Sequence, residues 1–312
     1  MNEFKHYTVM KNEAVDALNC TNGKIYVDCT LGGGGHSELI LKRIQPDGHL
    51  IAFDVDEDAI TAASERLKDY KNLTIVKNSY TNIKKVLHEL GIEKITGGVL
   101  FDLGASYHQF NKAERGFSFS KEAPLDMRFN QDAEFSAYDV VNNYKEDELV
   151  RIFSEYGEER FSKRIAKKIV EQRKVKNIET TSELANLIVN CTPHIKSSIH
   201  PATRVFQAIR IEVNQELTNV KNTLNDVLDL VGFDAIISVI SFHSLEDRLV
   251  KHLFKYHSQK CHCDKNQMIC KCAPPILELV NKKPIMASDR EILENPPSRS
   301  AKLRIAKCIR VS

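Results

Sequence analysis

The chain has 312 residues, of which 42% are hydrophobic and 28% are charged, and its formal net charge is +2. This is the composition of an ordinary folded protein, and the length allows one large core or a core with a smaller domain. No apolar run approaches the roughly 18 residues that suggest a membrane span. Residues 1–10 also lack the apolar stretch of a signal peptide, so we expect a cytoplasmic protein.

Charge is unevenly distributed along the chain. Residues 1–150 carry 17 Lys and Arg against 24 Asp and Glu, whereas residues 151–210 carry 12 against 6 and residues 299–312 carry 5 against none. A basic middle and a basic tail can face a polyanion such as nucleic acid. A lysine-rich, solvated helix face explains the same counts, and charge alone does not separate the two interpretations.

Short apolar segments alternate with helical segments from residue 25 to residue 104. The apolar segments have the length of strands, and the segments between them have apolar residues at helical spacing. We predict strands at 25–28, 49–55, 73–76 and 97–103, and helices at 37–44, 59–67 and 83–90. Strands joined by helices of this length form βαβ units, so the pattern predicts a mostly parallel sheet of the α/β class.

The pattern changes after residue 108. Residues 109–135 show no clear period and are predicted to be a loop, whereas residues 136–190 are predicted to be helical. Thr180 and Glu183 have the spacing of a capping box for a helix over 182–189. The sequence therefore predicts a helical segment in the middle of the sheet.

The sheet resumes after this helical segment. One long amphipathic helix is predicted from Arg204 to Leu230, and strands are predicted at 235–241 and 301–309. We therefore predict two domains, an α/β domain formed by 1–108 and 208–312 and an all-helical domain inserted over 109–207.

A glycine-rich segment follows the first predicted strand. Residues 28–36 read Asp-Cys-Thr-Leu-Gly-Gly-Gly-Gly-His, and Asp54 lies near the end of the second strand, twenty positions after Gly34. Glycines in such a turn let a ligand approach the backbone, and an acid at the end of the next strand can accept both ribose hydroxyls of a nucleoside. Together these features predict a cofactor that contains adenosine.

Two details favour S-adenosylmethionine over NAD as that cofactor. The dinucleotide pattern G-x-G-x-x-G fits poorly, because Gly32 and Gly34 match it but position 37 is Ser. Asp28 comes shortly before the glycines, where an acid can bind the amino group of a methionine moiety and would repel a pyrophosphate.

Seven further motifs follow in order. They are Asp-Leu-Gly-Ala-Ser-Tyr-His-Gln (102–109), Arg-Gly-Phe-Ser-Phe (115–119), Pro-Leu-Asp-Met-Arg (124–128), Tyr-Gly-Glu-Glu-Arg (156–160), Ala-Thr-Arg-Val-Phe-Gln-Ala-Ile-Arg-Ile (202–211), Ile-Ser-Phe-His-Ser-Leu-Glu-Asp-Arg (240–248) and Asn-Pro-Pro-Ser-Arg-Ser-Ala-Lys-Leu-Arg (295–304). With the glycine segment, this series closely resembles the bacterial 16S ribosomal RNA cytosine-N4 methyltransferase family, from about His6 onward.

The resemblance implies a class I methyltransferase fold, which is Rossmann-like, with a helical insertion after the fourth strand. It implies methyl transfer from S-adenosylmethionine to the exocyclic N4 of a cytidine in the 16S ribosomal RNA of the small subunit. It also implies cofactor contacts at Gly34, Gly35, His36, Asp54, Tyr80, Asp102 and Gln109. The family usually reads Asp-Leu-Gly-Val-Ser-Ser, where this chain has Ala105 and Tyr107. Tyr80 can pack on adenine, although a core tyrosine is also consistent with its position.

Three residues are candidates for catalysis: Asp102, Asp126 and His243. The N4 lone pair of cytosine is conjugated into the ring, so an oxygen that accepts an N4 hydrogen bond would help to localise it and receive the proton. Asp102 lies at the end of the fourth strand, where it can do this or bind only the cofactor. For Asp126 and His243 the alternative is a structural role in ordering their loops.

The helical insertion and the basic tail are the candidates for RNA binding. A base inside folded RNA must be unstacked to enter such a pocket, and cations can then hold the backbone. The cationic side chains expected to do so are Arg164, Lys167, Lys168, Arg173 and Lys174. The sequence leaves the oligomeric state open, a homodimer included.

Other functions fit parts of the same pattern. The glycine segment alone fits a methyltransferase for another nucleic acid or for protein, and an RNA-binding assembly factor could keep the fold without catalysis. An NAD oxidoreductase is disfavoured, because no Tyr-x-x-x-Lys pair follows the sheet.

Four of the eight cysteines are clustered. Cys261, Cys263, Cys270 and Cys272 form C-x-C-x6-C-x-C, and four thiolates can close a tetrahedral zinc site. A loop of reduced thiols is the alternative, and the predicted activity requires no metal.

Overall fold

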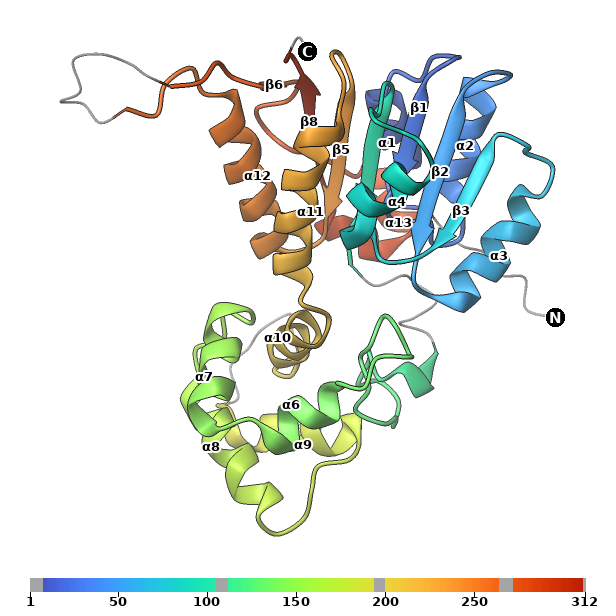
Figure 1. Cartoon of the computed structure of the whole chain (residues 1–312). Helices are drawn as coiled ribbons and strands as arrows, with labels where there is room; N and C mark the ends of the chain where they lie inside the picture. Colours follow the sequence, from blue (N-terminus) through green and yellow to red (C-terminus); the bar gives the residue numbers. More distant parts are fainter. Residues whose placement is uncertain (1–7, 105–111, 194–199, 264–271, 311–312) are drawn as a thin grey trace. The chain divides into compact units, whose positions relative to one another are not determined.

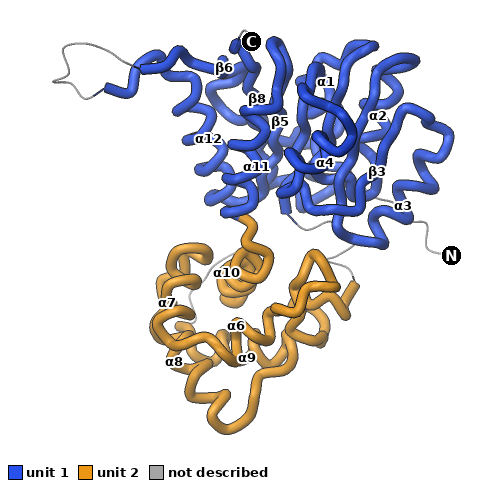
Figure 2. The backbone as a smooth tube through the Cα atoms, viewed as in Figure 1, with its two compact units in different colours: residues 1–104, 217–312 blue, residues 105–216 orange. Residues whose placement is uncertain are grey.

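The computed structural model describes residues 8–104, 112–193, 200–263 and 272–310. The chain forms two compact units, one of residues 1–104 with 217–312 and one of residues 105–216 (Figures 1 and 2). Among the described residues, no helix is both long enough and apolar enough to span a membrane.

The first unit is built on one sheet. Its strands follow the order β3-β2-β1-β4-β5-β8-β6, and β7 also pairs with β8. The first five in this order are parallel, whereas β8 is antiparallel to β5, β6 and β7. The strands are β1 (Ile25–Asp28), β2 (His49–Asp54), β3 (Leu73–Lys77), β4 (Gly98–Asp102), β5 (Ile236–Ser241), β6 (Leu277–Leu279), β7 (Ile285–Met286) and β8 (Lys302–Cys308).

Helices cover both faces of this sheet, so its central strands β1, β2, β4 and β5 are largely buried, whereas β3 is only partly buried. On one face α4 (Ile83–Glu89), α11 (Glu216–Leu230) and α12 (Ser244–Ser258) contribute to a core with Val27. On the other face α1 (Lys11–Ala17), α2 (Gly35–Ile44) and α3 (Glu57–Leu67) form a core with Tyr26. Adjacent residues of β1 thus face opposite layers, as the pleat requires.

The strand order reverses between β1 and β4. The chain moves outward in one direction through β2 and β3, then returns to the other side of β1 with β4 and β5 (Figure 1). In an open α/β sheet, ligands bind beyond the carboxyl ends of the strands at such a switch point. The ends of β1 and β4 therefore mark the candidate site.

The second unit has its own apolar core. It contains α6 (Ala137–Asn143), α7 (Glu146–Glu155), α8 (Ser162–Arg173), α9 (Thr181–Cys191) and α10 (Thr203–Asn214). Leu149, Phe153 and Ile165 are among the side chains that fill this core. The predicted capping box is confirmed, because Thr180 caps α9 and its hydroxyl accepts a hydrogen bond from the Glu183 N–H.

The prediction of one helix from Arg204 to Leu230 is wrong. Gln215 adopts a left-handed conformation (φ 49°) and separates α10 from α11. The helical unit therefore ends at residue 216, beyond the predicted boundary at 207, and begins at residue 105 instead of 109. Both helices are amphipathic, so the apolar periodicity continues across the break and conceals it.

Candidate active site

The glycine loop joins β1 to α2 at the switch point. Gly34 precedes α2 in a left-handed conformation (φ 75°), which costs a glycine little. At Gly35 a Cβ atom would lie 1.8 Å from Thr8 Oγ1, so no larger residue fits without displacing that side chain. The predicted cofactor residues Gly34 and Gly35 thus lie where neighbouring side chains pack directly against the backbone of the loop.

Asp54 orders the glycine loop from the end of β2. Its Oδ2 accepts a hydrogen bond from the Gly32 N–H at 2.8 Å. Its Oδ1 accepts from the N–H groups of Val55 and Asp56 at 2.8 and 2.9 Å. Burial raises the pKa of this carboxyl. Asp54 therefore faces the loop, as an acid that binds a ribose must, and contact with a ribose stays a prediction.

Asp28 lies beneath the glycine loop. It is fully buried, and its oxygens accept hydrogen bonds from Ser37 Oγ at 2.7 Å and from the Thr30 N–H at 3.1 Å. Burial raises its pKa to about 6. With no exposed surface, Asp28 is placed to hold the loop and α2 together, and not to bind the amino group of a ligand as the sequence suggested.

Asp102, the last residue of β4, has one oxygen that no described residue satisfies. Its backbone N–H donates to Thr30 Oγ1 at 2.7 Å, which joins β4 to the glycine loop. Its side chain is 23% exposed, but Oδ1 is buried and has no hydrogen-bond partner in the described part of the chain. Burial, and then the carboxylates of Asp28, Glu246 and Glu291, raise its pKa well above the ordinary range.

His36 lies beside Asp102. Its Nε2 is 3.0 Å from the Val9 carbonyl oxygen, which can only accept a hydrogen bond, so this nitrogen carries the proton. In the neutral ring Nδ1 is then an acceptor, and it lies 3.8 Å from Asp102 Oδ2. The two predicted cofactor residues are thus adjacent in the structure.

Tyr80 follows β3, in a short 3-10 helix, η1 (Tyr80–Asn82). Its ring packs edge-on against Phe101 of β4, with ring centroids 5.9 Å apart, and it remains half-buried. The core contact that the sequence left open is therefore present. Contact with an adenine stays a prediction.

His243 caps the helix that follows β5. Its Nδ1 accepts a hydrogen bond from the Glu246 N–H at 3.4 Å, and its Nε2 lies 3.1 Å from Glu246 Oε1. Glu246 is buried, and its carboxylate accepts from the Phe242 N–H at 2.8 Å. The ring of His243 thus has the structural role that the sequence left open, and a role in catalysis stays a prediction.

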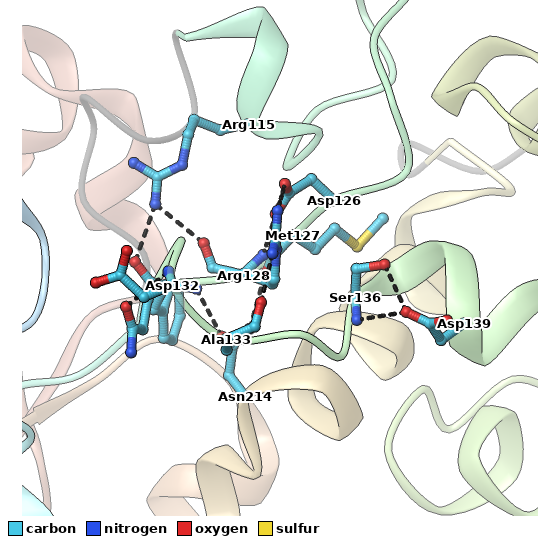
Figure 3. Close-up of polar contacts among 11 residues, drawn as sticks. Arg115, Asp126, Met127, Arg128, Asp132, Ala133, Ser136, Asp139 and Asn214 are labelled. Atoms are coloured by element: carbon cyan, nitrogen blue, oxygen red, sulfur yellow. Dashed lines mark hydrogen bonds and ion pairs between the residues drawn. The ribbon is translucent and has the colours of Figure 1, made fainter.

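Asp126 lies in the helical unit and is paired with an arginine (Figure 3). Arg128 donates to its two oxygens through Nε and Nη2, at 3.0 and 2.6 Å. Asn214 bridges this segment to α10 by donating to the Met127 carbonyl at 2.8 Å, and buried Arg115 donates to the carbonyls of Arg128 and Phe129. Asp126 therefore orders its loop, whereas a direct part in catalysis stays a prediction.

The sequence analysis missed several residues that build the site. Thr30 and Ser37 connect the glycine loop to Asp102 and Asp28, and Arg66 Nη1 donates to the Gly33 carbonyl at 3.3 Å. Nothing in their spacing distinguishes them, because each acts through a contact made only in the fold. Gln109, predicted to bind the cofactor, lies outside the described residues, as do Ala105 and Tyr107.

The strand order, the glycine loop and the acid that ends β2 define a class I methyltransferase. The model of the MraW methylase family matches residues 3–309, and the chain belongs to that family. It is an S-adenosylmethionine-dependent methyltransferase, which confirms the predicted fold class and cofactor. The donor set fits this cationic cofactor, because Asp102, which lies beside the glycine loop, has an oxygen with no hydrogen-bond partner in the part of the chain that the structure describes.

The chain is similar over its whole length to two curated proteins named ribosomal RNA small subunit methyltransferase H. It is 50% identical over 309 residues to that of Clostridium botulinum (strain Loch Maree / Type A3), covering 98% of this chain and 100% of that protein. It is 48% identical over 311 residues to that of Clostridioides difficile (strain 630), with the same coverage.

Among solved structures, one similar chain is an rRNA methylase from Streptococcus thermophilus. The match has 10% sequence identity and a TM-score of 0.42, and it covers 96% of this chain and 95% of that chain.

Proposed function

We propose that this protein transfers the methyl group of S-adenosylmethionine to the exocyclic N4 of a cytidine in 16S ribosomal RNA, in the cytoplasm. Its relatives of about 50% identity carry the name of a small-subunit ribosomal RNA methyltransferase. The observation that carries the proposal is Asp102, whose carboxyl lies at the switch point, is 23% exposed and has one oxygen, Oδ1, without a hydrogen-bond partner among the described residues. An acceptor in that position can receive an N4 hydrogen bond.

Gly34, Gly35, His36, Asp54, Tyr80, Asp102 and Gln109 are the residues that we propose hold the cofactor. When bound, S-adenosylmethionine supplies a methyl group activated by its sulfonium. The glycine loop allows close backbone approach, and Asp54 faces it from the end of β2. The main catalytic task of the chain is alignment, because in-line displacement needs the acceptor nitrogen opposite the sulfur.

In this proposal Asp102 acts on the acceptor N4 atom of the cytidine as well as on the cofactor. Bound S-adenosylmethionine would supply the methyl group to N4, and N4 would then have to lose a proton. An Asp102 carboxylate that accepts the N4–H during the reaction localises the lone pair and takes that proton. Burial, and after it the neighbouring carboxylates, raise the pKa of Asp102; a cation bound beside it would lower that pKa, so cofactor binding would favour the ionised base.

The helical unit is the part that we propose binds RNA. Arg164, Lys167 and Lys174 are exposed on or directly after α8. Lys168 is also exposed but lies 3.2 Å from Glu171. Arg173 does not fit the expected role, because it donates to the Val141 and Tyr144 carbonyls at 2.8 and 2.5 Å and so supports the unit itself.

The proposal is tested by methyl transfer from labelled S-adenosylmethionine to small ribosomal subunits that lack their native methylations, with naked RNA in parallel. Nucleoside mass analysis should find N4-methylcytidine. The Asp102→Asn variant should lower kcat by about 10²- to 10⁴-fold, a larger loss than its loss of S-adenosylhomocysteine affinity, because Asp102 is proposed to act on both the cofactor and the acceptor. Asp54→Asn should instead weaken S-adenosylhomocysteine binding, because the single amide oxygen can accept from the Gly32 N–H or from the Val55 and Asp56 N–H groups but not from both sides as the carboxylate does.

Other results would change the assignment. Label in another nucleoside or in protein would overturn the proposed acceptor and keep the methyltransferase. Tight cofactor binding with no transfer to either RNA substrate would favour a non-catalytic assembly factor. Equal losses of kcat and cofactor affinity in Asp102→Asn would restrict Asp102 to cofactor binding.

A further inference from the structure

Three cysteine side chains meet in the loop between α12 and β6. Cys261 and Cys263 lie in the arm that leaves α12, and Cys272 lies in the arm that leads to β6. Their Sγ atoms all lie within 4.8 Å of one another, and those of Cys263 and Cys272 are 3.4 Å apart. This separation is far longer than a disulfide bond of about 2.05 Å.

The sulfur separations suit a tetrahedral metal ion. Zinc–sulfur bonds of about 2.3 Å in a tetrahedron place the sulfurs roughly 3.8 Å apart. The backbone also donates to the sulfurs, since the His262 N–H lies 3.1 Å from Cys272 Sγ and the Cys263 N–H lies 3.3 Å from Cys261 Sγ. Hydrogen bonds of this kind orient metal ligands and stabilise the negative charge of thiolates.

Burial does not explain why these thiols gather. Cys29 and Cys308 are buried and pack in the core, where cysteine behaves as a small apolar residue. Cys261, in contrast, is exposed, and Cys263 and Cys272 are only partly buried. Three thiols held together near the surface gain little from the hydrophobic effect, so a ligand that binds sulfur accounts for the cluster better.

The loop around the thiols has an ordered base. The Ile276 N–H donates to the His257 carbonyl at 3.0 Å, which joins the two arms near α12. The His262 ring stacks on Tyr256, with ring centroids 4.1 Å apart. The hydrogen bond joins the two arms, and the stacking holds His262, which lies between Cys261 and Cys263, against α12. Neither contact involves a sulfur, so the thiols are presented in advance to a ligand.

We propose that Cys261, Cys263 and Cys272 bind one zinc ion as thiolates and that the ion joins the two arms of this loop. Binding releases the thiol protons to solvent. The sequence supplies a fourth thiol, Cys270, which lies outside the described residues. Closing a loop of this length costs chain entropy, and a metal bridge would offset part of that cost.

The test uses the full-length chain without a histidine tag, purified under reducing conditions without chelator. Elemental analysis should find about one zinc ion per chain. After removal of zinc, Co²⁺ should give the intense visible absorption and the near-ultraviolet sulfur-to-metal charge-transfer band of a tetrahedral thiolate site, and added Zn²⁺ should abolish both. The lysines within and beside the loop, Lys260, Lys265 and Lys271, should be cleaved by a lysine-specific protease faster in the metal-free chain.

Matched variants identify the ligands. Cys263→Ser and Cys272→Ser should each lose the zinc and the charge-transfer band, whereas Cys20→Ser, a partly buried cysteine elsewhere in the same unit, should keep both. The wild-type cobalt titration decides the question even if a variant fails to fold. Absence of zinc together with no thiolate spectrum from Co²⁺, or metal retained in both serine variants, would overturn the proposal.

Discussion

Three carboxylates end three neighbouring parallel strands. Asp28, Asp54 and Asp102 are the last residues of the adjacent strands β1, β2 and β4. The carboxyl ends of these parallel strands lie side by side at the same end of the sheet. In each case burial is the largest cause of a raised pKa, and Asp28 contributes further to that of Asp102. Like charges gathered in a poorly solvated place favour a cation, and S-adenosylmethionine carries positive charge on both its sulfonium and its ammonium.

The raised pKa of Asp28 should make the stability of the protein depend on pH. Its pKa is about 6 in the folded chain, above the ordinary 3.8. The folded state therefore binds the proton more tightly, and the contribution of Asp28 to stability falls as the pH rises from about 4 to 6. The Asp28→Asn variant lacks this loss. Its free energy of unfolding, minus that of wild type, should therefore increase by up to about 3 kcal/mol as the pH rises from about 4 to 6.

Urea denaturation from pH 4 to pH 8 measures the difference. Asn keeps an oxygen for the Thr30 N–H and can donate to Ser37, so the loop contacts should largely survive. The exposed Asp69→Asn variant serves as the control and should run parallel to wild type. An Asp28→Asn curve that also runs parallel would show that Asp28 carries no raised pKa.

At the scale of elements, the start of α2 depends on its contact with α3. Gly34 and Gly23 both have a φ of 75°, so an alanine at either position meets the same backbone strain. A Cβ at Gly34 would lie 3.1 Å from Leu67 Cδ1 and 3.3 Å from Ala63 Cβ, both in α3, whereas a Cβ at Gly23 would meet nothing within 4 Å. Alanine variants at the two positions therefore separate the cost of backbone strain from the cost of a clash with α3.

Gly23→Ala should lower the free energy of unfolding by about 1 kcal/mol, the cost of a left-handed alanine. Gly34→Ala should lower it further, because α3 must also move, and it should weaken S-adenosylhomocysteine binding. Urea denaturation and calorimetric titration measure the two effects. Equal destabilisation by the two variants, with unchanged cofactor affinity, would show that α2 and α3 are not tightly packed at Gly34.

Sequence patterns predicted the parallel strands well because each is a short, mostly apolar segment bounded by polar residues, and most of them are largely buried. The predicted segments 25–28, 49–55, 73–76 and 97–103 match β1 to β4 within a residue at each end. The break at Gln215 was missed, because a left-handed glutamine leaves no signature in composition. The short α1 and β6 were also missed, since three to seven residues are too few to establish a period.

At the scale of the whole molecule, positive charge is concentrated in one stretch of the helical unit, although the unit as a whole, residues 105–216, carries 17 Lys and Arg against 17 Asp and Glu. Residues 151–210 carry 12 Lys and Arg against 6 Asp and Glu, whereas residues 1–150 are acidic. If this unit holds the RNA backbone, each phosphate contact contributes about 0.7 to 0.9 to the dependence of log K on log salt. Cofactor binding should not depend on the same residues.

The double variant Arg164→Gln/Lys167→Gln should weaken RNA binding and lower the salt slope by about 1 to 2. Fluorescence anisotropy with a 16S ribosomal RNA fragment across a salt series measures both quantities, and the Kd for S-adenosylhomocysteine should be unchanged. Lys68→Gln/Lys85→Gln, which removes two exposed lysines of the other unit, is the control. The same salt slope in wild type and both variants would locate the RNA contact elsewhere.

The candidate site could be predicted only in part. Asp54 and Asp102 were found from their places at strand ends, because parallel strands bring those ends to one edge. The capping role of His243, the arginine pair of Asp126 and the carbonyl contacts of Arg173 could not be found, since each depends on partners that the fold alone specifies. The order of the motifs was enough to identify the family. Only the contacts in the fold show which of the candidate site residues have a structural role.

The pairing of β4 with β5 has a consequence for the order of folding. Gly98 pairs with Ile236, so these adjacent strands close a stretch of chain that contains the whole helical unit. Closing a long flexible stretch costs entropy, and helices with local contacts form sooner than distant strand pairs. The helical unit should therefore gain amide protection in pulse-labelled hydrogen exchange before β5 does. A helical unit that folds early shortens the flexible stretch between β4 and β5. It thereby assists the pairing of these two strands, and the methyl-transfer site depends on the completed sheet.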